Sequence, residues 1–201
     1  LNKEEGITYD AASNRLFVVM SYVEKGMTDA YKDENVNAVN YNHVRVAKNS
    51  CGTVYALDLD ANSVATKMYG LVNGKEMTTP YDVSSPYFGN TCDVNGIANP
   101  DNVTFIPGYN TLIIGEDTGS GHQNDAIWSY NLGTKALTRI ETTPYGSETT
   151  SPYFYPNING WGYLMSVVQH PYGESDTGKV DTGSAERRAY TGYVGPFPKM
   201  D

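Results

Sequence analysis

A strand–turn–strand unit that occurs three times is the feature that most limits what this chain can fold into. The copies cover residues 5–21, 99–117 and 150–169. Each copy has a small or polar lead-in, a short run rich in strand-forming residues, a turn with Asn or Gly, and a longer apolar run. Apolar residues in these runs alternate with a period of two and not 3.6, which indicates β-strands and very little helix.

The first two copies are each followed by a second hairpin, at residues 52–70 and 126–141. The turn sequences DANS and NLGTK separate alternating strands in these segments. Four strands per unit is the pattern of a β-propeller blade, and the spacing between the second and third copies fits blade repeats of roughly 40–50 residues. We therefore expect an all-β fold with about three propeller blades.

The 201 residues are enough for one large domain or for part of a larger one, and we predict a single domain over residues 1–201. Inserts at about residues 22–50 and 71–98 lengthen the first unit, and loops of this length are more often functional than accidental. Typical propellers have four to eight blades, and an open arc of three blades exposes strand edges. The sequence therefore predicts a part of a larger propeller, or a propeller whose other blades come from elsewhere.

The formal net charge of −9 argues against nucleic-acid binding, which requires a basic surface. A surplus of carboxylates is compatible with hard cations such as calcium, and equally with a plain acidic surface. No run of 18 apolar residues occurs, so no membrane-spanning helix is expected. The two cysteines, Cys51 and Cys92, form no CxxC pair, and their spacing does not decide between one disulfide and two free thiols.

Acidic residues stand at equivalent places in the three units. Glu5, Asp101 and Glu148 each lie in the lead-in to the first strand of a unit. Lead-ins to the first strands of successive blades surround one central channel, where three carboxylates would repel one another unless a cation neutralised them. Each acid is also an ordinary turn residue when it is considered alone. We predict that the three carboxylates face a common channel.

The segment GEDTGSGHQNDAIWSY, residues 115–130, collects polar side chains in one short loop: Glu116, Asp117, His122, Asn124 and Asp125. Turn chemistry and a metal site both account for such a loop. An EF-hand is excluded because Trp128, and not Glu, stands at the twelfth position from Asp117. The chain also has no GxSxG, Walker, HExxH or strand-linked GxGxxG motif.

Five short segments, in this order, resemble the C-terminal half of the PhoX family of alkaline phosphatases: EGITYD, NPDNVTF, GHQNDAIWSY, GSETTSPYFYPN and VVQHP. The resemblance covers about residues 4–173. It implies a six-bladed propeller with calcium and iron in its channel, which hydrolyses small-molecule phosphate monoesters and is periplasmic or secreted. The chain would then be the C-terminal portion of that propeller, would need the missing N-terminal blades as partners, and would be inactive alone.

The resemblance also implies a set of metal ligands, namely Glu5, Asp101, Asp117 and Glu148. Glu5 matches the opening acid, Asp101 the acid of a PDN motif, and Glu148 the acid of a GxEvTGp segment. Asp117 matches the acid of a TDG-like motif, although both neighbouring residues depart from it. The family's iron-linked cysteine lies in a segment that has no counterpart here, so its role is not transferred to either cysteine.

Candidate phosphate contacts are His122 and Asn124, with Arg139 as the nearest candidate for a phosphate-binding arginine, whereas Asp125 is expected to cap a turn. Two other functions remain open. One is a calcium-dependent lactonase or esterase of the paraoxonase and gluconolactonase type, whose propellers also place Asn, Asp and Glu around a calcium ion. The other is a non-catalytic propeller that binds a partner and has no channel metal.

Overall fold

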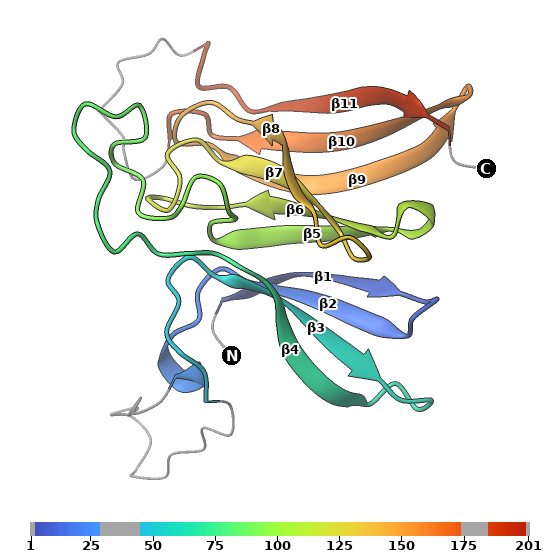
Figure 1. Ribbon diagram of the computed structural model, residues 1–201. Helices are drawn as coiled ribbons and strands as arrows, with labels where there is room; N and C mark the ends of the chain where they lie inside the picture. The colour runs from blue at the N-terminus through green and yellow to red at the C-terminus, as the bar shows by residue number, and fades with distance from the viewer. Residues whose placement is uncertain (1–2, 29–44, 174–184, 200–201) are drawn as a thin grey trace.

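The structure is a computed structural model that describes residues 3–28, 45–173 and 185–199. It contains three antiparallel sheets (Figure 1). The first sheet has the strands β1 (Glu4–Asp10), β2 (Arg15–Met20), β3 (Thr53–Leu59) and β4 (Ala65–Asn73). The second has β5 (Pro100–Ile106), β6 (Thr111–Glu116), β7 (Ala126–Asn131) and β8 (Leu137–Thr142), and the third has β9 (Glu148–Ile158), β10 (Trp161–Gln169) and β11 (Tyr190–Pro198).

The predicted all-β fold is confirmed, and each hairpin expected from the sequence forms. Within each sheet, strands that follow one another along the chain are neighbours, and the described part of the chain contains no closed barrel. Its only helical segments are two 3-10 turns, η1 (Lys25–Met27) and η2 (Pro107–Tyr109). Neither turn is long or apolar enough to cross a membrane. The inserts become the β2–β3 and β4–β5 connections, and residues 29–44 of the first insert lie outside the described residues.

Strand β11 is the one strand that the alternation of apolar residues does not predict. It pairs with β10 along its length, from Tyr190 opposite Val168 to Pro198 opposite Trp161. The sequence TGYVGPFP carries two glycines and two prolines, which are residues depleted in strands and which hide the alternation. An edge strand tolerates proline because one side of its backbone has no partner strand.

The three sheets stack through the faces on which apolar residues alternate. A core between the first and second sheets contains Phe17, Val19, Val54, Leu112, Ile114 and Trp128. The opposite face of the second sheet packs on the third sheet through Ile113, Ile127 and Leu164. Each such side chain contributes roughly 1.5–3 kcal/mol through burial. The second sheet is therefore covered on both of its faces.

The outer faces of this stack remain partly open. On β1, Thr8 lies opposite Phe17, which belongs to the core between the first and second sheets. Its neighbours Ile7 and Tyr9 therefore lie on the outer face of the first sheet. Ile7 is 61% exposed on the other face. On the third sheet, Tyr153 and Tyr193 lie in one cross-strand row and are 60% and 63% exposed. Both ends of the stack thus present apolar and aromatic side chains to solvent.

Two glycines allow the sheets to approach closely near their first strands. A side chain on Gly6 of β1 would place a Cβ atom 2.8 Å from the backbone oxygen of Asp101 on β5. A Cβ on Gly115 of β6 would lie 2.8 Å from Oγ1 of Thr149 on β9. Strand β5 therefore contacts β1 on one side and β9 on the other, which brings the starts of the three units together.

Candidate metal centre

Three carboxylates meet where the second and third sheets begin. Asp101 lies at the start of β5, Asp117 directly follows β6, and Glu148 is the first residue of β9. One oxygen of each side chain lies within 4.8 Å of those of the other two, and all three residues are half-buried. Carboxylate oxygens in such an arrangement are the ligands that calcium prefers. The structure therefore brings together three of the four predicted metal ligands.

The fourth predicted ligand, Glu5, lies on β1 and is exposed. It is not one of the three carboxylates in the cluster, although its charge helps to raise the pKa of Asp101. The first unit instead contributes a cation. Lys3 Nζ lies 2.7 Å from Oδ2 of Asp117 and 3.7 Å from Oδ1 of Asp101. Lys3 was not among the predicted site residues, although it stands two residues before Glu5 in the same lead-in.

A bulge in β5 contains Asp101, and a main-chain hydrogen bond positions Asp117. The pairing of β5 with β6 shifts between Pro100 and Asn102, so Asp101 is an additional residue in a bulge. Bulges bend a strand and redirect side chains next to functional sites. The Nδ2 group of Asn102 donates a hydrogen bond of 2.7 Å to Asp101 Oδ2. The backbone N–H of Asp117 donates a hydrogen bond of 3.1 Å to the backbone oxygen of Asn99.

Within residues 3–28, 45–173 and 185–199, the cluster carries more negative charge than its ion-pair partners balance. Burial, followed by the charge of Asp117, raises the pKa of Asp101 to about 6. The same two causes raise the pKa of Glu148 to about 6, and the hydrogen bond from His170 at 3.3 Å opposes the rise. Burial works against the charged form of Lys3, but the hydrogen bond to Asp117 still raises its pKa. One ammonium group does not neutralise three carboxylates, so a further cation would be stabilised here.

The pKa values give a testable pH dependence for the protein without metal. Folding raises the pKa values of Asp101 and Glu148, so the folded state binds protons more tightly than the unfolded chain between about pH 4 and 6, and stability falls as the pH rises through that range. The Glu116 carboxylate raises the pKa of His122 despite its burial, so the stability from this pair is also lost at higher pH.

We expect the melting temperature in EDTA to be about 5 °C higher at pH 5 than at pH 7.5. Calcium should raise the melting temperature more at pH 7.5, where the acids are ionised. Thermal scans of the chain and of Glu148→Gln at both pH values check this, because the variant should show a smaller difference. A melting temperature in EDTA that rises from pH 5 to pH 7.5 would contradict the assignment.

The loop after β6 is organised by Glu116, whose side chain is fully buried. Its Oε1 accepts hydrogen bonds from Ala98 N at 2.8 Å and Trp128 Nε1 at 2.6 Å. Its Oε2 interacts with His122 Nδ1 and accepts a hydrogen bond from Ala126 N, both at 2.9 Å. A buried carboxylate with four partners joins the β4–β5 connection, β7 and the loop itself.

The predicted substrate-binding residues each have partners elsewhere in the protein. His122 is buried, with Nδ1 on Glu116 and Nε2 3.2 Å from the Asp93 carbonyl oxygen, so its ring stabilises the loop interior. Asn124 is exposed and donates to the Thr143 oxygen at 3.0 Å. Its predicted phosphate contact stays a prediction.

Arg139 lies on β8, which is the strand of the second sheet farthest from β5. At ordinary strand spacing, β8 and β5 are roughly 14 Å apart. The Arg139 guanidinium stands 4.8 Å from the centre of the Trp128 ring and donates to the Val94 carbonyl oxygen. These contacts engage the Arg139 guanidinium, and its predicted phosphate contact stays a prediction. Asp125, in contrast, accepts a hydrogen bond from Thr118 N at 3.0 Å within the loop, as expected for a turn-capping acid.

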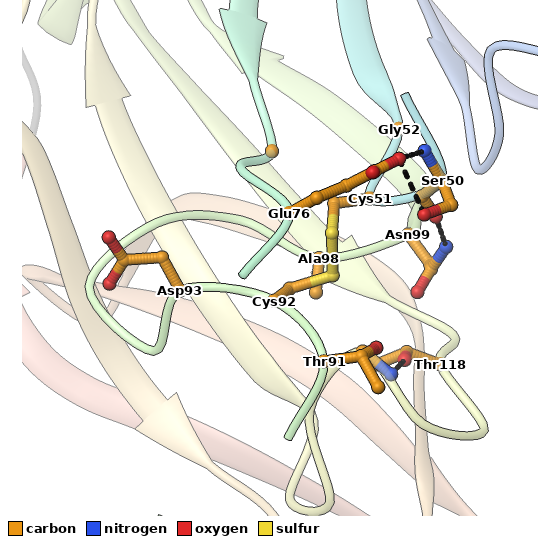
Figure 2. Close-up of a disulfide and its surroundings, with 12 residues drawn as sticks. Ser50, Cys51, Gly52, Glu76, Thr91, Cys92, Asp93, Ala98, Asn99 and Thr118 are labelled. Carbon is orange, nitrogen blue, oxygen red and sulfur yellow. Dashed lines mark hydrogen bonds between the residues drawn. A yellow bond between two sulfur atoms is a disulfide. The ribbon is translucent and has the colours of Figure 1, made fainter. Parts of the chain in front are cut away.

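Cys51 and Cys92 form a disulfide, which settles the choice that the sequence left open (Figure 2). Both residues are buried beside Ala98. Asn99 N donates to the Cys51 oxygen at 2.9 Å, and Asn99 Nδ2 donates to the Ser50 oxygen at 2.7 Å. The disulfide thus holds the segment that leads directly into Asp101.

Comparisons with known proteins found no relative of this chain. No family model, curated protein or solved structure matches the chain. The resemblance to the PhoX family therefore rests on the five short segments alone.

Proposed function

We propose that this chain is part of a calcium-dependent β-propeller phosphatase that hydrolyses phosphate monoesters. The observation that carries the proposal is the cluster of Asp101, Asp117 and Glu148, which lies between neighbouring sheets and whose negative charge exceeds that of its cationic partners in the described part of the chain. Phosphate esters are polyanions, and an acidic cluster binds them only through a cation that it holds. The order of the segments that resemble the phosphatase family supports the same activity.

The donor set fits calcium better than it fits thiolate-bound iron. Calcium binds six to eight oxygen atoms, and three carboxylates provide up to six. The chain has two cysteines, and both are in the disulfide, so neither offers a thiolate to iron. We therefore keep calcium in the proposal and assign no iron ligand to this chain.

The arrangement of the sheets supports a propeller that has further blades. The first strands β1, β5 and β9 contact one another in sequence order, as the innermost strands of successive blades do. The exposed apolar faces at both ends of the stack suit additional sheets. In this proposal the remaining blades come from a longer natural chain, and the disulfide supports an oxidising location such as the periplasm or the cell exterior.

Each residue of the cluster has a defined part in this proposal. Asp101, Asp117 and Glu148 would hold calcium, which when bound supplies a Lewis acid for a phosphoryl oxygen. Partial burial of these acids strengthens their interaction with a cation. His170, 3.3 Å from Glu148, orients that carboxylate, as residues next to metal ligands commonly do.

Activity assays test the proposal against its alternatives. The 201-residue chain and a longer natural chain that contains it would be assayed with p-nitrophenyl phosphate and with a lactone, in calcium and in EDTA. We expect calcium-dependent phosphate release by the longer chain and little release by the shorter one, because the shorter chain leaves the channel wall incomplete. Asp117→Asn should lower the rate on the order of 100-fold, and Asp82→Asn, at an exposed turn, should not.

The lactonase alternative shares the oxygen ligands, so the substrate decides between the two enzymes. Turnover of the lactone without turnover of the phosphate ester would replace phosphatase by lactonase. A longer chain that hydrolyses neither substrate would favour the binding propeller.

A further inference from the structure

Lys3 occupies the position of a cation in the acidic cluster. Its ammonium group lies 2.7 Å from Asp117 Oδ2 and 3.7 Å from Asp101 Oδ1, so it contacts two of the three acids that would hold calcium. A bound calcium ion approaches its oxygen ligands to about 2.3–2.6 Å. Calcium and the ammonium group would therefore compete for Asp117 and would repel each other across Asp101.

The main chain and a neighbouring ring fix the place of Lys3. Ser21 N donates a hydrogen bond of 3.2 Å to the Lys3 carbonyl oxygen, which ties the residue to the end of β2. The ammonium group also lies 5.9 Å from the centre of the Tyr22 ring, within the range of a cation–π interaction. The Tyr22 ring therefore adds to the interactions that hold the ammonium group beside the two acids.

We propose that Lys3 is an internal counter-ion that competes with calcium for Asp117 and thereby sets the calcium affinity of the cluster. The inference rests on the proposed function, because it takes the cluster as a calcium site. Lys3 would partly neutralise Asp101 and Asp117 in the metal-free protein, and its ammonium group would have to leave Asp117 when calcium binds. Removing its charge relieves both the competition and the repulsion, so both effects act in the same direction.

Calorimetric titration of calcium into the 201-residue chain tests this inference without any measurement of activity. We expect Lys3→Met and Lys3→Gln to bind calcium about tenfold more tightly than the unmodified chain. Lys3→Arg keeps the charge and should stay within about twofold of the unmodified chain. Lys75→Met is the matched control, because Lys75 pairs with Asp93 in another ion pair at 3.1 Å and should leave the affinity unchanged.

The outcomes separate the two proposals. If neither the unmodified chain nor the Lys3 variants take up calcium, or if Asp117→Asn binds it as well as the unmodified chain, the metal site and the proposed function fail. If the folded Lys3→Met and Lys3→Gln variants bind calcium no more tightly than the unmodified chain, the counter-ion role fails while the metal site stands. Circular dichroism establishes that each variant is folded.

Discussion

Replacing Glu116 with alanine is expected to lower the free energy of unfolding by roughly 3–5 kcal/mol. The side chain is fully buried and accepts hydrogen bonds from Ala98, Ala126 and Trp128. It also faces the His122 ring. Alanine would remove every acceptor and leave these buried groups without their partner, which costs about 1–3 kcal/mol for each group that finds no water.

Urea denaturation in EDTA measures the effect of this substitution without a contribution from metal. The stability of Glu116→Gln should lie between those of the alanine variant and the unmodified chain. Glutamine retains one carbonyl acceptor, but its NH₂ group would face N–H donors and could not accept their hydrogen bonds. Glu186→Ala removes an exposed acid and should change stability by no more than about 0.5 kcal/mol. A loss below about 1 kcal/mol for Glu116→Ala would show that Glu116 does not organise the loop.

Removing the disulfide with Cys51→Ser and Cys92→Ser together is expected to cost about 4 kcal/mol. The bond joins residues that are 41 apart in sequence, and closing a loop of this length restricts the unfolded chain by about that amount. Both sulfurs are buried beside Ala98, so the new hydroxyl groups add a small desolvation cost.

Urea unfolding with and without dithiothreitol checks the disulfide prediction. The reductant should destabilise the unmodified chain to nearly the level of the double variant and should have no effect on the variant itself. Equal stability of the oxidised chain and the double variant would mean that the unfolded chain gains little freedom from the missing bond. The single variants are unsuitable controls because each leaves one free thiol that can form new disulfides once the chain unfolds.

Local pattern made most of the fold predictable. Alternation with a period of two, interrupted by Asn and Gly turns, located ten of the eleven strands within a few residues. Strand β11 was missed because Gly192, Gly195 and Pro196 interrupt that pattern. Its place in the third sheet depends on pairing with β10, which local propensity does not encode.

The acidic cluster was predictable in part because two of its members follow the repeat. Asp101 and Glu148 stand at equivalent starts of two units, and the structure places them together with Asp117. Lys3 was missed because it reaches Asp117 across 114 residues of sequence. The buried role of His122 was hidden for the same reason, since one of its partners is Asp93, 29 residues earlier.

The unequal covering of the three sheets has a consequence for how the molecule opens. The second sheet is packed on both faces, whereas the first and third sheets each have an outer face that is partly exposed. Local unfolding takes the least free energy where fewest apolar contacts are lost. Amide protons of β6 and β7 should therefore exchange with solvent only through global unfolding, while β9 to β11 should exchange through smaller, separate openings. The second sheet would then be the part of the molecule that keeps the acidic cluster in place during these local openings, because Asp101 lies at the start of its first strand, β5.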